Sequence, residues 1–446
     1  MFDRLIRGGR FGTVAGLRQA DLGLRDGRVA AWLALGKAAT AAETIDATRL
    51  VVQPGLIDPH MHFREPGLTH REDFASGTAA AALGDVTTAL VMTTDVPTTF
   101  TATERHTKAV LAEGHVHTDI GHLVAATRPD HIAALASASA VAIEVLLGDV
   151  SPALLLRDEA TQIAVMRACR TSGIVLGVRP AADAVIAAAE ALPRRPGCDP
   201  LDFLASRPAQ SEALGTARAH AAAGATGAAL HLRQTSCVES LALVQQAMPQ
   251  GLDLTAETTP HNLLLEADEI RRQGPRAKIL PTSRSAADHA ALWPALRERG
   301  GTSCVATDHT PHSQAEKPAG MADIWAAPGG FPGVQTLLAL MLDAEAQGRI
   351  GWGDLVRLTS GAPAQRFSLR GKGSLVEGSQ ADFVLVDPSR RARTTDAQQS
   401  SRAGRSPFAG REVTGWPVST WLRGHLIATE AALLGAPRGQ VLRRGA

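Results

Sequence analysis

Residues 56–67, LIDPHMHFREPG, carry four side chains capable of chemistry directly after an apolar run: Asp58, His60, His62 and Arg64. On a strand, residues two apart point to the same side, so the two imidazoles can share one metal ion. The alternative is a pair of hydrogen-bonded histidines at a strand end that bind no ion. The accompanying Asp58, Arg64 and Pro-Gly turn favour the metal site.

The segment CVATDHTPH, residues 304–312, places Asp308 at the end of a second apolar run. A carboxylate there can ligate a metal ion, or it can act as general base toward a metal-bound water, whose pKa can fall to about 7. A single Asp after a strand is also a common helix cap. Because two histidines follow it and an HxH strand lies elsewhere in the chain, we predict that Asp308 is a catalytic residue and a metal ligand.

The composition excludes several classes of function. The chain has 446 residues, of which 45% are hydrophobic, so it can bury the core of one large domain or of two unequal ones. Its 45 basic and 44 acidic residues nearly cancel, and no long run of one charge stands out. Nucleic acid and anionic membrane surfaces are therefore poor candidates for a partner. A small-molecule substrate or a protein partner remains.

The cysteines and the amino terminus indicate the compartment. Cys169, Cys198, Cys237 and Cys304 have no CxxC or metal-type spacing, so we interpret them as ordinary buried or half-buried thiols. The first residues, MFDRLIRGGRFG, lack the apolar core of a signal peptide, and no later stretch is apolar enough to span a bilayer. We expect a cytoplasmic protein.

The pattern along the chain predicts a barrel and a β module. Residues 1–50 alternate apolar and polar positions, and RDGR is typical of a tight turn between two strands. Further on, short apolar runs alternate with Ala-rich helical stretches such as DFASGTAAAALG and SEALGTARAHAAAG. Roughly eight such units favour a closed (β/α)₈ barrel, in which chemistry lies at the carboxyl ends of the strands. After about residue 370 the β pattern returns, so we expect the chain ends to pair. The polar residues 388–407 are predicted to form a surface loop.

Five segments spread over the chain resemble signature segments of the cyclic amidohydrolases, and they are most similar to the longer bacterial dihydroorotases and to allantoinases. The segments are VVQPGLIDPHMHFREPG, VATDHTPHSQAEK, APGGFPGVQT, GKGSLVEGSQADFVLVDP and SPFAGREVTGWPVSTWLRG. The resemblance implies a (β/α)₈ TIM barrel with a composite β-sandwich formed by both termini. We place the barrel at residues 53–368 and the two parts of the sandwich at residues 1–52 and 369–446.

The resemblance also implies a metal site, in which this chain departs from the family. Members usually hold two divalent metals, commonly zinc, around a hydroxide that attacks a cyclic amide or imide carbonyl. His60, His62 and Asp308 match three of the family's ligands. Glu144 in IEVLLG stands where a carboxylated lysine usually bridges the metals. The two histidines of the second metal are matched by arginines, Arg179 in VRPAAD and Arg233 in LRQTS.

These substitutions predict at most one firmly held ion. Glutamate can ligate a metal, although it is shorter than a carboxylated lysine, whereas a guanidinium has no lone pair to donate to a cation. We therefore predict one zinc ion on His60, His62, Asp308 and Glu144. The arginines could fill the vacated space with positive charge, pair with Glu144 or Asp308, or hold an anionic group of a ligand. His231 is a less favoured replacement ligand.

The substrate positions are mixed. Arg64 matches the arginine that holds the carboxylate of dihydroorotate, and His312 matches a histidine near the substrate. Thr94 and Leu280 stand where the family usually has asparagine, while Arg284 is retained. The predicted substrate-binding residues are Arg64, Thr94, His312, Arg179 and Arg233.

Two functions follow from the resemblance. The first is hydrolysis of a cyclic amide, with a carboxylate-bearing substrate or, with altered specificity, a hydantoin-like one. The second is a non-catalytic role as structural or regulatory partner, for example of aspartate carbamoyltransferase. The complete HxH and TDHTPH segments favour the hydrolase, and the resemblance makes a homo-oligomer plausible.

Overall fold

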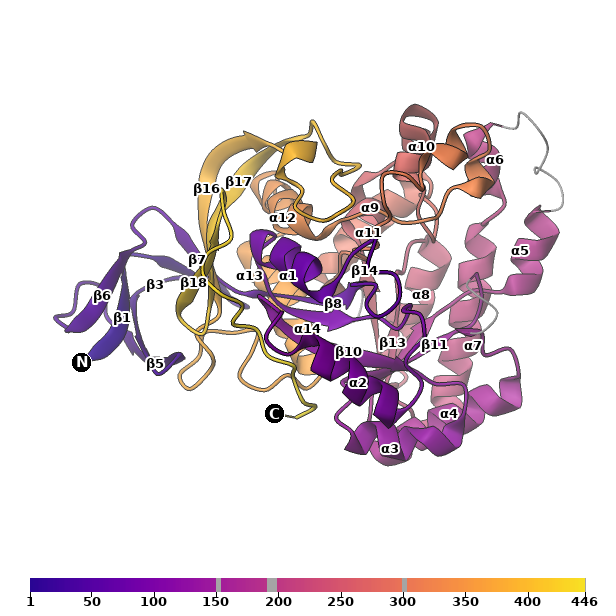
Figure 1. Ribbon diagram of the computed structural model, residues 1–446, viewed down its shortest axis with the longest axis horizontal. Helices are drawn as coiled ribbons and strands as arrows, with labels where there is room; N and C mark the ends of the chain where they lie inside the picture. The colour runs from indigo at the N-terminus through magenta and orange to yellow at the C-terminus, as the bar shows by residue number, and fades with distance from the viewer. Residues whose placement is uncertain (150–153, 191–198, 299–302, 446) are drawn as a thin grey trace.

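The computed structural model describes residues 1–149, 154–190, 199–298 and 303–445. Figure 1 shows a β-rich part at one end, built from the first and last segments of the chain, beside a larger α/β part. Among the described residues, no helix is both long and apolar enough to cross a membrane.

The larger part is the predicted barrel. Its sheet has eight parallel strands among the described residues, and each pairs with the next along the chain. The first and last strands meet where Met61 bridges to His309, and the His62 amide donates to the His309 carbonyl at 2.9 Å. The strands are β8 (Leu56–Met61), β9 (Val86–Val91), β10 (Asp119–Ala125), β11 (Ala142–Leu146), β12 (Leu176–Arg179), β13 (Leu230–Leu232), β14 (Leu254–Thr258) and β15 (Cys304–Val305). The contact between Met61 and His309 brings the HxH strand beside Asp308.

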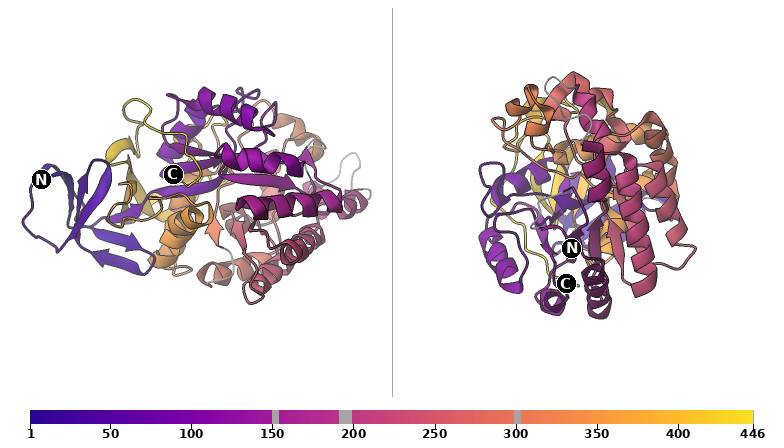
Figure 2. Two further views of the ribbon diagram at one scale, coloured as in Figure 1. Left: turned by 90° about the horizontal axis from the view of Figure 1, so that it is seen from below. Right: turned by 90° about the vertical axis from the view of Figure 1, so that its right-hand side faces the viewer.

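Helices cover the outside of the barrel, as the right-hand view of Figure 2 shows. The two Ala-rich stretches form helices α1 and α7, as predicted; α1 begins with a capping box between Asp73 and Ser76. The helices are α1 (Phe74–Leu83), α2 (Ala102–Ala112), α3 (Ile132–Ser137), α4 (Glu159–Ser172), α5 (Asp183–Glu190), α6 (Pro200–Ala205), α7 (Ala209–Thr226), α8 (Val238–Ala247), α9 (Pro260–Leu264), α10 (Asp268–Gln273), α11 (Ala286–Arg297), α12 (Leu337–Ala346), α13 (Trp352–Val356) and α14 (Ala362–Arg366).

The β-rich part contains two sheets and joins the two ends of the chain, which confirms the predicted composite module. One sheet has the order β5-β4-β1-β6, and the other has the order β18-β17-β16-β7-β2-β3. In the second sheet β7 lies between β2 and the C-terminal β16. The strands are β1 (Phe2–Arg7), β2 (Arg10–Thr13), β3 (Gly16–Gln19), β4 (Asp21–Arg25), β5 (Arg28–Leu33), β6 (Ala41–Asp46), β7 (Val51–Pro54), β16 (Phe383–Arg393), β17 (Glu412–Leu422) and β18 (His425–Thr429). The exact domain boundaries remain a prediction.

The predicted turn between β4 and β5 is present, whereas the predicted surface loop begins later than expected. The RDGR turn joins β4 to β5, and both Asp26 and Gly27 have the positive φ that this hairpin turn requires. The loop predicted over residues 388–407 is wrong at its start, because β16 continues to Arg393 and pairs there with Glu412 of β17. The end of this strand is polar and largely exposed, so it gave no apolar signal.

Three predicted thiols, Cys169, Cys237 and Cys304, are buried, whereas position 198 lies outside the described residues.

Asp85 lies where the barrel meets the sandwich, and its carboxyl group makes stability depend on pH. The buried carboxyl accepts a hydrogen bond from Thr420 Oγ1 at 3.0 Å. Burial raises the pKa of Asp85 from 3.8 to about 8. Between these values the folded chain holds a proton that the unfolded chain has lost. The stability from this group is therefore complete below about pH 4 and is lost as pH rises through about 8.

Asp85→Asn is expected to remove this pH dependence. An amide keeps an acceptor for Thr420, tolerates the left-handed backbone of this position, and carries no charge. Urea unfolding should show a free energy of unfolding raised by several kcal/mol at about pH 9 and nearly unchanged at about pH 3.5, where Asp85 is protonated in the folded chain and largely protonated in the unfolded chain. Asp26→Asn, at an exposed position that is also left-handed, is the matched control. Identical behaviour of both variants at both pH values would contradict this assignment.

Candidate active site

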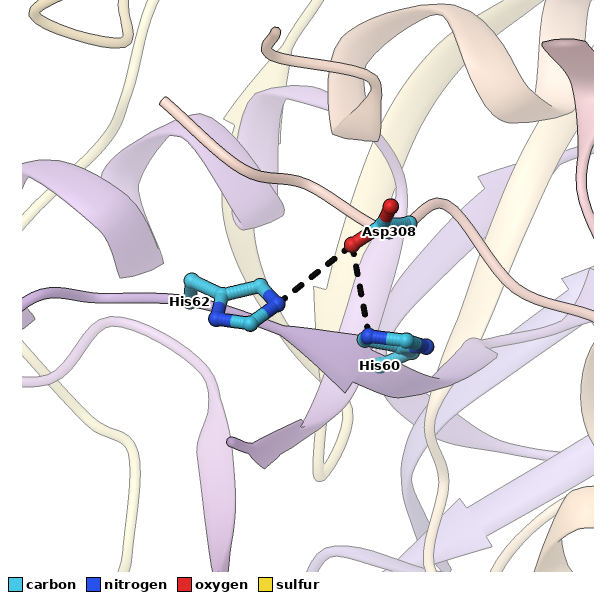
Figure 3. Close-up of side chains that lie close together, drawn as sticks. All are labelled: His60, His62 and Asp308. Carbon is cyan, nitrogen blue, oxygen red and sulfur yellow. Dashed lines mark ion pairs between the residues drawn. The ribbon is translucent and has the colours of Figure 1, made fainter. Parts of the chain in front are cut away.

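His60, His62 and Asp308 form a buried cluster at the carboxyl ends of the first and last barrel strands. Asp308 Oδ1 lies 3.2 Å from His60 Nε2 and 3.3 Å from His62 Nε2, as Figure 3 shows. One ligand atom from each residue lies within 4.8 Å of the others. The Asp58 carboxylate holds the two strands together, since it accepts from the His60 amide and from the Thr307 amide, each at 3.1 Å. The predicted juxtaposition of the HxH pair and Asp308 is present.

The donor atoms of this cluster fit a zinc-type ion. Two imidazole nitrogens and a carboxylate oxygen are a common catalytic set that leaves a position open. The other ring nitrogens are engaged: His60 Nδ1 lies 2.5 Å from Glu257 Oε1, and His62 Nδ1 lies 2.6 Å from Thr94 Oγ1. Both rings are thereby oriented with Nε2 toward Asp308. Such outer contacts fix the tautomer that a metal ligand needs.

The protonation states also suit a cation. Burial lowers the pKa of His62 to about 3, so this imidazole is neutral. Burial alone would raise the pKa of Asp308, but the neighbouring His60 and His62 lower it below its ordinary value, so the carboxylate is ionised. Burial lowers the pKa of His60, but the charges of Glu257 and Asp308 outweigh that effect and raise it. A cation that replaces this proton would be favoured by the same two carboxylates.

Glu144, predicted as a metal ligand, and Arg233, predicted as a substrate-binding residue, bond to each other inside the barrel. Arg233 Nε donates to Glu144 Oε2 at 3.2 Å, and Arg233 Nη2 pairs with Glu144 Oε1. This is the pairing between an arginine and Glu144 that the sequence left open. His231 also lies apart from the cluster, with its Nε2 3.1 Å from Glu257 Oε2.

The residue of the LRQTS segment that reaches Asp308 is Gln234, which the sequence reasoning passed over. Its Nε2 donates to Asp308 Oδ2 at 2.5 Å and to the Leu280 carbonyl at 3.1 Å. Gln234 follows the short β13 and has a φ of 56°, so the chain turns there. The sequence signal that could have identified Gln234 is its place as the second polar residue after β13. Glu257 was missed as well, because it lies within β14 rather than after it.

A cleft of about 1150 Å³, its opening included, leads to the cluster. All five predicted substrate-binding residues line it: Arg64, Thr94, His312, Arg179 and Arg233. Leu280, which replaces a family asparagine, lines it too, whereas the retained Arg284 lies in a neighbouring cavity and pairs with Glu212 at 3.1 Å. The cleft therefore combines the cluster with several guanidinium groups.

Arg64 is the most informative of these cations. It is only 5% exposed; its Nη1 donates to Thr94 Oγ1 at 3.0 Å, and its Nη2 lies 3.4 Å from His312 Nε2. Within the described residues its Nε has no hydrogen-bond partner, and no carboxylate lies within ion-pair distance of the guanidinium. Burial lowers the pKa of Arg64 only to about 10, so it stays charged at neutral pH. A buried cation without a carboxylate is costly unless a ligand supplies one.

The comparisons with known proteins agree with this geometry. Residues 51–427 match the model of the amidohydrolase family. The chain belongs to this family. An allantoinase of Rubrobacter xylanophilus is 33% identical and is covered over 98% of its length by 99% of this chain. A dihydroorotase of Halobacterium salinarum is 35% identical, over 84% of this chain and 85% of that protein.

A solved structure shows the same agreement in three dimensions. The L-hydantoinase of Arthrobacter aurescens superposes with a TM-score of 0.95 at 29% identity, and the match covers all of both chains. The predicted barrel with its added β module is confirmed. The predicted resemblance to cyclic amidohydrolases and the assignment as a hydrolase of carbon–nitrogen bonds are confirmed as well.

Proposed function

We propose that this amidohydrolase opens the ring of a carboxylate-bearing cyclic amide, using one divalent metal ion held by His60, His62 and Asp308. The observation that carries the proposal is the buried, charged Arg64 in the same cleft as the three ligands. The relatives named allantoinase, dihydroorotase and hydantoinase support a cyclic amide as the substrate class. The carboxylate is inferred from Arg64.

One ion, most simply zinc, is what these side chains support. Arg233 takes both oxygens of Glu144, so Glu144 is not available to bridge two ions. Arg179 lies at the end of β12 and its Nη2 is 3.5 Å from Asp149 Oδ2; a guanidinium cannot ligate a cation. When bound, the ion polarises the scissile carbonyl and lowers the pKa of a water.

Asp308 can serve as ligand and as proton carrier because its two oxygens face different partners. Oδ1 faces the two histidines, whereas Oδ2 accepts from Gln234. We assign Oδ2 the proton of the attacking water. The water oxygen bonds to the amide carbon, the carbon–nitrogen bond breaks, and Asp308 returns the proton to the leaving nitrogen. Gln234 holds the carboxylate in position for both transfers.

Arg64 and its neighbours bind and orient the substrate. Arg64 offers Nε and Nη groups to a carboxylate, and a bidentate pair of this kind fixes both position and orientation. Thr94 Oγ1 contacts both Arg64 Nη1 and His62 Nδ1, so one hydroxyl group connects the proposed carboxylate-binding residue to a proposed metal ligand. Burial and the charge of Arg64 lower the pKa of His312 to about 2, which makes it a neutral partner for the ring. Arg179 and Arg233 line the other side of the cleft, and the charge of Arg233 is balanced by Glu144 and Glu257.

A metal analysis combined with a substrate panel tests the proposal. Protein purified without chelator should contain about one zinc or similar ion per chain. It should open dihydroorotate or hydantoin carrying an acetate group faster than the same rings without the carboxylate, with allantoin as a further candidate. Absence of bound metal after incubation with zinc would overturn the proposal. Equal rates on both members of each pair would overturn the assigned carboxylate.

The remaining alternatives have less support. No observation on the described residues favours a non-catalytic role, so that alternative is not proposed. A carbamoyltransferase partner, a homo-oligomer and the cytoplasmic location remain predictions from the sequence.

A further inference from the structure

Behind the metal ligands lies a buried polar network that the proposed reaction does not use directly. It consists of Arg233, Glu144, Glu257 and His231, all on the inner side of the barrel and each at most 1% exposed. Arg233 Nη1 donates to Glu257 Oε2 at 2.8 Å and to the Pro59 carbonyl at 3.1 Å. Buried groups of this kind are stable only when nearly every donor and acceptor has a partner.

The network is centred on Glu257, which contacts three of its neighbours. Its Oε1 accepts from His60 Nδ1 at 2.5 Å, and its Oε2 accepts from Arg233 and from His231. His231 is held in turn by Thr255 Oγ1, 2.8 Å from its Nδ1. Glu257 therefore cannot rotate without breaking several bonds at once. Its Oε1 fixes both the ring plane of His60 and the nitrogen that carries the proton.

A glycine inside the barrel, Gly177, leaves the space that the Glu144 carboxylate occupies. Gly177 on β12 stands beside Glu144, and a Cβ atom added there would lie 2.1 Å from Glu144 Oε1. Any larger residue at position 177 would push the carboxylate away from Arg233. Phe367 closes the other side, with its ring centre 5.5 Å from the Arg233 guanidinium carbon and 5.2 Å from the His231 ring centre. The Arg233 side chain is therefore held in one position by Glu144 and Glu257.

We propose that Arg233 and Glu257 are positioning residues for the metal ion: the fixed guanidinium locks Glu257, and Glu257 holds His60 with Nε2 directed at the ion. Arg233 also donates hydrogen bonds to the carboxylate oxygens of Glu144 and Glu257, which could otherwise bind a second cation. This inference rests on the proposed metal site. It adds that the affinity for the ion is set partly by residues that never contact it. Removing such an outer partner typically weakens metal binding 10–100-fold.

Two variants and a matched control test the inference through metal affinity. Glu257→Gln keeps the shape of the side chain but removes its charge. Arg233→Lys keeps the charge but cannot hold both carboxylates, because an ammonium lacks the planar fork of a guanidinium. The control is Glu212→Gln, which removes another buried glutamate paired with an arginine, Arg284, in the same barrel. Cobalt(II) is titrated into each metal-free chain against a chelator, and the visible absorption of bound cobalt is recorded.

The expected result is a cobalt dissociation constant about 10–100-fold higher in Glu257→Gln and about 10-fold higher in Arg233→Lys. The cobalt spectrum should change in Glu257→Gln, while Glu212→Gln should match the wild type in both readouts. If Glu257→Gln does not fold, as judged by circular dichroism, Arg233→Lys and Gly177→Ala decide the test. Gly177→Ala displaces Glu144 without changing the chemistry of Glu257 or His60, and it should weaken cobalt binding as well.

The failures of the two proposals are distinguishable. A wild-type chain that binds no cobalt overturns the proposed function and this inference together. A wild-type chain that binds one ion, with affinity and spectrum unchanged in the folded variants, overturns the inference alone. Equal weakening in Glu212→Gln would overturn it too, because the effect would then reflect general loss of buried charge.

Discussion

The double substitution His60→Ala with His62→Ala is expected to remove the metal ion and the hydrolysis together. Two of the three ligand atoms around the candidate site disappear, and Asp308 alone cannot hold a divalent ion at ordinary concentrations. Metal catalysis of this kind supplies several kcal/mol of transition-state stabilisation. Each 1.36 kcal/mol corresponds to a factor of ten, so we expect kcat to fall by about 1000-fold or more.

The measurement is metal content by elemental analysis, followed by ring opening of the best substrate, on wild type and variant. The control is His106→Ala with His115→Ala, which removes two exposed histidines and should change neither quantity. A double variant that retains one ion per chain would mean that other residues hold the metal. Two ions in the wild type would show that the arginines do not exclude a second one.

The core of the site could be predicted because its signals are local. His60 and His62 are separated by one residue on β8, and Asp308 directly follows the short β15. The barrel closes through the contact between Met61 and His309, so its topology alone brings the three side chains together. The same holds for the fold, since alternating strands and helices predict a barrel and two β-rich chain ends predict a composite sheet.

The surroundings of the site could not be predicted, because they depend on contacts distant in sequence and on single backbone turns. Glu257 contacts His60 across 197 positions, and within β14 it resembles any polar strand residue. The positive φ of Gln234 decides which residue of LRQTS reaches Asp308, and no pattern around it indicates that turn. Arginine at position 233 suggested several roles, and only the positions of Glu144 and Glu257 identify its partners.

Arg64→Met is expected to lower kcat/KM for carboxylate-bearing substrates by about 100-fold while leaving the uncharged rings nearly unaffected. Truncating one partner of a buried charge pair costs about 2–5 kcal/mol, and a factor of 100 corresponds to about 2.7 kcal/mol. The substrates supply the control, since dihydroorotate and dihydrouracil share one ring and differ in the carboxylate. For dihydrouracil we expect a change of no more than about threefold.

The stability of Arg64→Met separates a binding role from a structural one. Arg64 is buried beside Thr94 and His312 with no carboxylate within ion-pair distance among the described residues, so its burial costs solvation energy that no ion pair within the fold returns. Replacing it with an apolar side chain of similar length should leave the melting temperature unchanged or raise it, as is common when a residue is kept for activity. A lower melting temperature, with both substrates affected equally, would mean that Arg64 supports the fold, and it would remove the basis for the proposed substrate carboxylate.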